Sequence, residues 1–277
     1  MNKHFKRFLA STLVIIMLCL TMQPITTQAK ANSAQGFTID ARAYLRKCAP
    51  ENIQAAPLFK SGGSTHTHQY IVTKALAILR NDQGSSILNN STNASELKTY
   101  TDWPDKVGNE SDSATYSGHF YNPYTEKSWT GSKTKNALTR AMGYFNDAIE
   151  AAKAGNMSDA IINIGKGTHY VSDMNEPHHA SNLTALNSNH TEFEKYVDEN
   201  RTKFYIAGST LDDYLYTETQ TRAMSDILKD GAFYAYDLKY MAQEEDTYYE
   251  AANLCVQHAI QNVAQYLYAF GVEAGIY

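Results

Sequence analysis

Residues 167–182 read GTHYVSDMNEPHHASN, and this stretch constrains the fold of the chain more than any other. The preceding residues 160–164 are apolar enough to belong to a buried helix that continues into the stretch. In such a helix His169 and Asp173, four positions apart, leave the same face one turn from each other. An imidazole and a carboxylate in this relation can bind one metal ion.

A second pair follows soon after the first. Pro177 lacks an amide hydrogen, so we expect it to end the helix and to place His178 and His179 on the loop that follows. His190 and Glu194 then repeat the spacing of four residues. Two such pairs, with a further histidine beside the first, indicate a metal site more strongly than either pair alone.

Histidine is concentrated in the middle of the chain, because seven of the nine histidines lie between His66 and His190. A single histidine or aspartate at a helix end is ordinarily a cap or a hydrogen-bonded polar group, but the whole set favours metal binding. Ligands of this kind without cysteine are typical of a catalytic, hydrolytic site, for which zinc is the expected ion.

The first residues predict export. Residues 1–7 carry several basic side chains, and residues 8–22 are apolar but form a stretch that is short for a membrane span. Gln28-Ala29 then precedes Lys30. These three features predict a signal peptide over 1–29 and a secreted, extracellular protein. A lipoprotein would need a small residue before Cys19, where Leu18 stands. Signal removal takes three of the 24 basic residues and none of the 29 acidic ones, which leaves a net charge of −8. We therefore expect no nucleic-acid partner.

The remainder predicts one all-α, multi-helix domain. Residues 30–60 are polar and contain prolines, as in a leader or pro-segment, and the domain is expected over 61–277 with no transmembrane segment. Cys48 and Cys255 could form a disulfide or could both be buried thiols. Asn-Gly hairpin signals between alternating runs are absent from the sequence. Helices are expected from residue 64 or 65, and over 133–154, 159–171, 191–204, 211–228, 232–241 and 247–270, with a long irregular segment over 99–123.

Several strings together resemble a known family. Residues 168–182, SGHFYNPY at 117–124, TDW at 101–103, HQYIV at 68–72 and HTEFE at 190–194 are similar in order and spacing to the bacterial zinc-dependent phospholipase C family. This family includes the phosphatidylcholine-preferring enzymes and the catalytic domain of alpha-toxin. The resemblance covers residue 64 to the C-terminus and implies an all-helical domain with three zinc ions in a cleft.

The resemblance also implies a role for each matching residue. One zinc would be held by Asp102, His119, His169 and Asp173, a second by His179, His190 and Glu194, and a third by His68, with Asp173 as a bridge. Asp102 would also take the proton from the attacking water. His66 and His178 match no ligand position and are expected to be exposed neighbours of the ligands.

Two aromatic residues, Trp103 and Tyr116, match the family's binding site for a quaternary ammonium head group, although both could be packed rings. In the family, main-chain atoms of an N-terminal tryptophan complete the third zinc site, and no tryptophan precedes His68 here. We therefore expect a second cleavage near residues 55–58. The alternative is that the segment stays attached and that His66 or water completes the site.

The function implied is hydrolysis of the glycerol-side phosphodiester bond of phosphatidylcholine-like lipids, which releases diacylglycerol and the phosphorylated head group. The enzyme would act as a monomer at a membrane surface. A single-strand-specific zinc nuclease of the same fold is one alternative, and a zinc-binding protein without turnover is another. The acidic balance and the strings at 117–124 and 179–182 favour the lipid.

Overall fold

The computed structural model describes residues 66–277. The predicted signal peptide, the leader, the start of the domain and the second cleavage all lie outside the described residues, and so does Cys48. Cys255 is described: it is buried in the last helix, and its thiol donates to the carbonyl of Ala252. The pairing of the two cysteines therefore stays a prediction.

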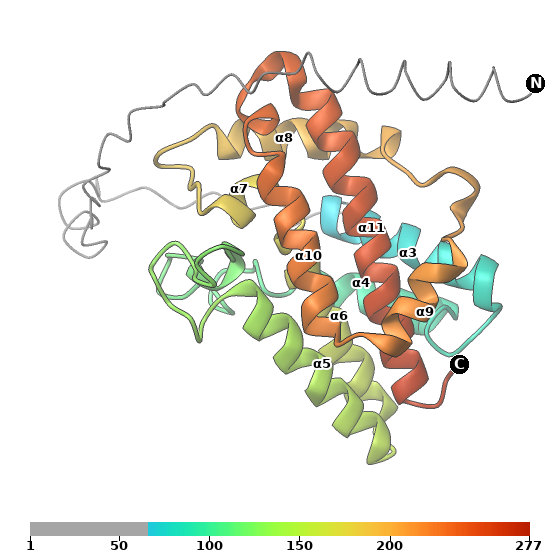
Figure 1. Ribbon diagram of the computed structural model, residues 1–277. Helices are drawn as coiled ribbons and strands as arrows, with labels where there is room; N and C mark the ends of the chain where they lie inside the picture. The colour runs from blue at the N-terminus through green and yellow to red at the C-terminus, as the bar shows by residue number, and fades with distance from the viewer. Residues whose placement is uncertain (1–65) are drawn as a thin grey trace, which may run out of the picture. The chain divides into compact units, whose positions relative to one another are not determined.

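The described residues form helices joined by loops, without a β-strand anywhere between 66 and 277 (Figure 1). A single isolated bridge joins Asn122 and Lys127 within this range. The prediction of an all-α fold is confirmed. The α-helices are α3 (Thr67–Gln83), α4 (Ser91–Thr101), α5 (Ala137–Lys153), α6 (Met157–Met174), α7 (Pro177–Ser181), α8 (His190–Asn200), α9 (Asp213–Thr221), α10 (Met224–Asp237) and α11 (Tyr248–Glu273).

Three expectations about helix limits were wrong. The sequence did not predict α4, whose start is fixed by the Asn90 side chain accepting from the amide of Asn93. A single helix was expected over 211–228, but Arg222 and Ala223 are extended and separate α9 from α10. Pro177 does not end α6. It stands in the first turn of α7, where its missing amide hydrogen costs nothing.

Helices α6 and α11 form the centre of the core. Tyr266 of α11 is fully buried, and its hydroxyl donates to the carbonyl of Ala141 in α5 at 2.6 Å. A Cβ atom on Gly167 of α6 would lie 2.0 Å from that hydroxyl, so only glycine permits this approach of α6 to α11. Gly167 lies two residues before His169, and the contact therefore fixes the part of α6 that carries the predicted ligands.

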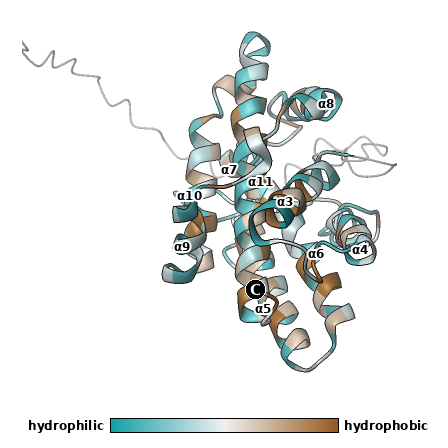
Figure 2. Ribbon diagram, turned by 90° about the vertical axis from the view of Figure 1, so that its right-hand side faces the viewer, coloured by the Kyte–Doolittle hydropathy of each residue, from teal (hydrophilic) through white to brown (hydrophobic). Residues whose placement is uncertain are grey.

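Strongly hydrophobic residues are visible on α3, α5 and α6 (Figure 2), and these helices contribute buried residues to the hydrophobic core. Across residues 66–277, every helix is too short or too polar to span a lipid bilayer.

Candidate metal centre

Buried imidazole and carboxylate groups gather in three places within residues 66–277. In each place the possible ligand atoms all lie within 4.8 Å of one another. The three groups are His119 with His169 and Asp173; His68 with Asp105 and His169; and Glu176 with His179, His190 and Glu194.

Helix α6 supplies His169, which the first two groups share, and Asp173 of the first group. His169 and Asp173 lie on one face as predicted, with Nε2 of the histidine 3.2 Å from Oδ2 of the aspartate. His169 Nδ1 lies 2.8 Å from the carbonyl oxygen of Thr101, which can only accept, so Nδ1 carries the hydrogen and Nε2 presents a lone pair to the group.

His119 reaches the same place from the loop before α5. Its Nδ1 lies 3.0 Å from Asp173 Oδ2 and 2.9 Å from His169 Nε2. Two ring nitrogens and a carboxylate oxygen this close need a shared proton or a cation between them. Burial alone would lower the pKa of His169, but Asp173 and Asp105 outweigh burial and raise that pKa well above its ordinary value.

Asp173 joins the groups to one another. Its Oδ2 faces His119 and His169, while its Oδ1 lies 3.6 Å from His68 Nε2 and 3.4 Å from His179 Nδ1. Burial, followed by repulsion from His169, lowers the pKa of His68 to about 3, so this imidazole is neutral and able to coordinate a metal. The predicted bridging role of Asp173 stays a prediction, and its position suits that role.

The structure brings Asp105, and not Asp102, into these groups. Asp105 Oδ1 lies 3.4 Å from His169 Nε2 and 3.5 Å from His119 Nδ1. Asp102 caps the C-terminus of α4, and its Oδ2 lies 3.9 Å from the ammonium of Lys106. The chain turns after α4 through Pro104, and this turn directs the second aspartate inward.

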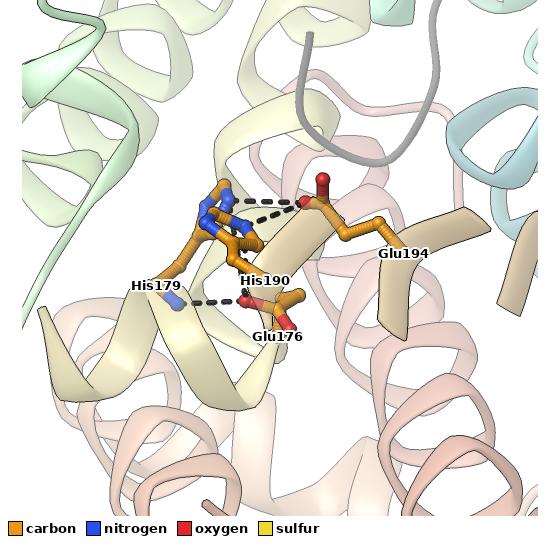
Figure 3. A group of neighbouring side chains, drawn as sticks. All are labelled: Glu176, His179, His190 and Glu194. Carbon is orange, nitrogen blue, oxygen red and sulfur yellow. Dashed lines mark hydrogen bonds and ion pairs between the residues drawn. The ribbon is translucent and has the colours of Figure 1, made fainter. Parts of the chain in front are cut away.

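The third group lies where α6 ends and α7 and α8 begin (Figure 3). His190 Nε2 and His179 Nε2 lie 2.9 Å and 3.4 Å from Glu194 Oε1. His179 Nδ1 donates to the carbonyl of His119 at 3.0 Å, which leaves Nε2 as the coordinating atom. The three predicted residues are therefore together, although His178 and His179 stand on a short helix and not on a loop.

Glu176 also belongs to the third group and was not predicted. Its Oε2 accepts from the amide of His179 at 2.7 Å and lies 3.8 Å from His190 Nε2. Burial would raise the pKa of Glu176, but His178 and the neighbouring imidazoles outweigh it and lower the pKa to about 2. Pro177 was the available signal, since proline is common at the first position of a helix and this makes Glu176 the N-cap.

His178 is fully buried and is not an exposed neighbour, contrary to expectation. Its Nδ1 lies 2.9 Å from Glu176 Oε1, and its Nε2 lies 3.1 Å from the side-chain oxygen of Asn189. It therefore orients Glu176. His66 is partly buried at the start of α3, with Nδ1 3.3 Å from Asp198 Oδ2.

The two predicted aromatic residues differ in their surroundings. Tyr116 is nearly buried and its ring centroid lies 5.6 Å from that of His119, so it borders the first group. The ring of Trp103 already faces a cation of the protein itself, because the ammonium of Lys166 lies 4.1 Å from its centroid. The same ammonium lies 5.4 Å from the ring centroid of Tyr144.

Some buried ligand atoms suit a cation. His119 Nε2, His179 Nε2 and Asp173 Oδ1 are buried and have no hydrogen-bond partner within residues 66–277. Buried polar atoms are nearly always paired, so atoms of this kind on α6, on α7 and in the loop before α5 fit bound metal ions.

Residues 67–203 match the family described as zinc dependent phospholipase C. The chain is 27% identical over 234 residues to a phospholipase C of Clostridium perfringens, which covers 74% of this chain and 58% of the relative. It is 32% identical over 167 residues to a phospholipase C of Clostridium haemolyticum, which covers 52% of this chain and 41% of the relative. The chain thus spans about half the length of these relatives.

Solved structures agree with the sequence comparison. The alpha toxin from Clostridium absonum superposes with a TM-score of 0.66 at 28% identity, covering 76% of this chain and 64% of that one. The Clostridium perfringens alpha-toxin from an avian strain superposes with a TM-score of 0.65 at 26% identity, covering 76% and 65%.

Proposed function

Because the chain belongs to the zinc-dependent phospholipase C family, we propose that it is a secreted phosphodiesterase that cleaves glycerophospholipids on the glycerol side of the phosphate. The products would be diacylglycerol and the phosphorylated head group. The observation that carries the proposal is the set of three buried ligand groups joined through Asp173.

The residues would hold three zinc ions. Asp105, His119, His169 and Asp173 would share one, His179, His190 and Glu194 a second, and His68 with Asp173 part of a third. When bound, zinc ions neutralise a phosphodiester and lower the pKa of a coordinated water. The chain keeps two of the imidazoles in a coordinating tautomer: the carbonyl of Thr101 fixes His169 and the carbonyl of His119 fixes His179.

We assign to Asp105 the role of proton acceptor that the family resemblance implied for Asp102, because Asp105 lies beside His119 and His169. Tyr116 is our candidate for contact with the head group, since it borders His119. Trp103 is a weaker candidate, because Lys166 covers its ring.

We also propose that 1–29 is removed as a signal peptide and that a second cut near 55–58 removes the leader that begins at Lys30. A freed α-amine has a lone pair for zinc, whereas an amide nitrogen does not. The cut would therefore complete the third site.

The test combines metal analysis with lipid hydrolysis. The purified protein should carry three zinc ions and release phosphorylcholine from phosphatidylcholine vesicles, and His169→Ala should lose zinc and nearly all turnover. His258→Gln is the matched control, because His258 lies in α11 outside the three groups. Full zinc content and activity in His169→Ala would refute the site. Faster cleavage of single-stranded DNA than of lipid would favour the nuclease instead.

A further inference from the structure

We propose that an exposed aromatic face beside the metal groups binds the head-group layer of a zwitterionic phospholipid membrane. The inference rests on the proposed function and deepens it, since it concerns how the enzyme meets a lipid aggregate. The aromatic face consists of Tyr124 from the loop after His119, Phe233 and Tyr236 from α10, and Tyr240 with Lys239 just beyond α10.

The rings form one cluster and are not scattered singly. Tyr124 lies 5.0 Å from Phe233 and 4.7 Å from Tyr236, measured between ring centroids. Phe233, Tyr236 and Tyr240 are spaced by three and four residues, which places them along one side of α10 and its continuation. Tyr124 is 63% exposed and Tyr240 is 72% exposed. Exposed apolar side chains that gather in this way mark interaction surfaces.

The charges of the face fit a zwitterionic head group. The ammonium of Lys239 lies 3.5 Å from the ring centroid of Tyr236 and 4.9 Å from that of Tyr240. A phosphate can pair with this ammonium, while exposed tyrosine rings can contact a quaternary ammonium. Glu126 is exposed and forms an ion pair with Lys229 at 3.5 Å, and Asp237 is exposed on α10. Charges of both signs therefore lie near the face, which fits a zwitterionic lipid better than a strongly anionic surface.

The aromatic face is connected to the metal groups through a short piece of chain. Phe120 stacks on His179 with ring centroids 4.6 Å apart, and the amide of Tyr121 donates to the carbonyl of His179. Tyr124 follows Tyr121 by three residues, so the two residues are separated by no more than about 11 Å of extended chain. Helix α7, which carries His179, also packs against α10 (Figure 1). A membrane touching the face would therefore hold its phosphates near the metal groups.

The experiment measures co-sedimentation of the zinc-loaded protein with vesicles of a phosphonate analogue of phosphatidylcholine, whose glycerol-side P–C bond is not hydrolysed, so that binding is read without turnover. Tyr124→Ser with Tyr240→Ser should weaken vesicle binding about tenfold, the effect expected for two exposed aromatic contacts with a cation. Tyr124→Trp with Tyr240→Trp should restore it. Tyr205→Ser with Tyr214→Ser is the matched control, because these tyrosines are 53% and 64% exposed and lie outside the aromatic face.

A second measurement separates the surface from the active site. Hydrolysis of a water-soluble phosphorylcholine ester should change less than twofold in the serine double variant, while hydrolysis of vesicles falls with binding. Unaltered vesicle binding by that variant, or an equal loss in the control pair, would overturn the inference. Failure to hydrolyse either substrate would instead count against the proposed function, because vesicle binding is read independently of turnover.

Discussion

The loop that carries His119 depends on Asp112, and we predict that Asp112→Ala will weaken both the fold and zinc binding. Asp112, Ser113, Ala114 and Tyr116 all have positive φ angles, between 48° and 66°. Residues other than glycine adopt this conformation at a cost of about 1–2 kcal/mol each. Such a loop persists only where its surroundings hold it in place.

Asp112 provides that hold through both carboxylate oxygens. Oδ1 accepts from the Arg140 guanidinium at 2.6 Å, and Oδ2 accepts from the amide of Gly118, next to His119, at 2.8 Å. The side chains of Asp112 and Arg140 are largely buried, at 13% and 17% exposure, so solvent screens their ion pair only weakly. Hydrogen bonds to charged groups contribute about 1.5–3 kcal/mol each, which gives about 3–6 kcal/mol for the two. If about 2.7 kcal/mol of this free energy serves to hold His119 in its ligand position, its loss would weaken zinc binding about 100-fold.

The assay is urea unfolding of the zinc-loaded and chelator-treated protein, combined with a competition measurement of zinc affinity. Glu273→Ala removes an exposed ion pair with Lys153 and is the control, expected to cost less than about 1 kcal/mol. Unchanged zinc affinity in Asp112→Ala, with stability within about 0.5 kcal/mol of the parent, would refute the reasoning.

Three further predictions follow from other parts of the molecule. Burial lowers the pKa of His258 from 6.5 to about 4, so as pH falls from 6.5 toward 4 the unfolded chain binds a proton before the folded chain does and stability is lost. Between pH 7 and 5 the unfolding free energy of the parent, measured in urea, should therefore fall by about 2 kcal/mol more than that of His258→Gln. Equal losses in the two proteins would contradict this. Because Lys166 covers its ring, Trp103→Ala should lower the unfolding free energy by about 1 kcal/mol and slow hydrolysis of choline and ethanolamine lipids by the same factor. A loss confined to choline lipids would show that Trp103 binds the head group. N-terminal sequencing of active secreted protein should find a start near residue 55–58, and a fully active protein that starts at Lys30 with three zinc ions would exclude the second cleavage.

Helical spacing predicted the parts of the site that lie on one element. His169 with Asp173, and His190 with Glu194, are brought together because a helix returns to the same face after four residues. Glu176 was not predicted, because it is not placed by helical spacing. Its position depends on the local turn between α6 and α7, where it caps α7, and on His178, which orients its carboxylate from two residues away. Neither contact follows from a periodic pattern.

The break between α9 and α10 shows a similar limit on predicting the fold. Residues 211–228 have the apolar spacing of one helix, yet Arg222 and Ala223 are extended. The Arg222 guanidinium binds Glu218 on α9 and Asp230 on α10, so it bridges the two helices across the bend. Packing of each helix against α11 outweighs the modest helical preference of two exposed residues.

Asp102 and Asp105 show the limit of assigning a zinc ligand and proton acceptor from sequence resemblance alone. The string TDWPD offers Asp102 and Asp105 three residues apart, and sequence similarity alone selected the first. The structure separates them: Asp102 faces Lys106, and Asp105 faces His169 and His119. Asp105→Asn keeps the size of the side chain but removes its charge, so it should lower zinc content and reduce turnover by at least about 100-fold, as expected for a lost ligand and proton acceptor. Asp102→Asn should keep its zinc and most of its turnover. Metal analysis and vesicle hydrolysis of the two variants, made in parallel, compare the assignments directly, and the opposite ranking would return the role to Asp102.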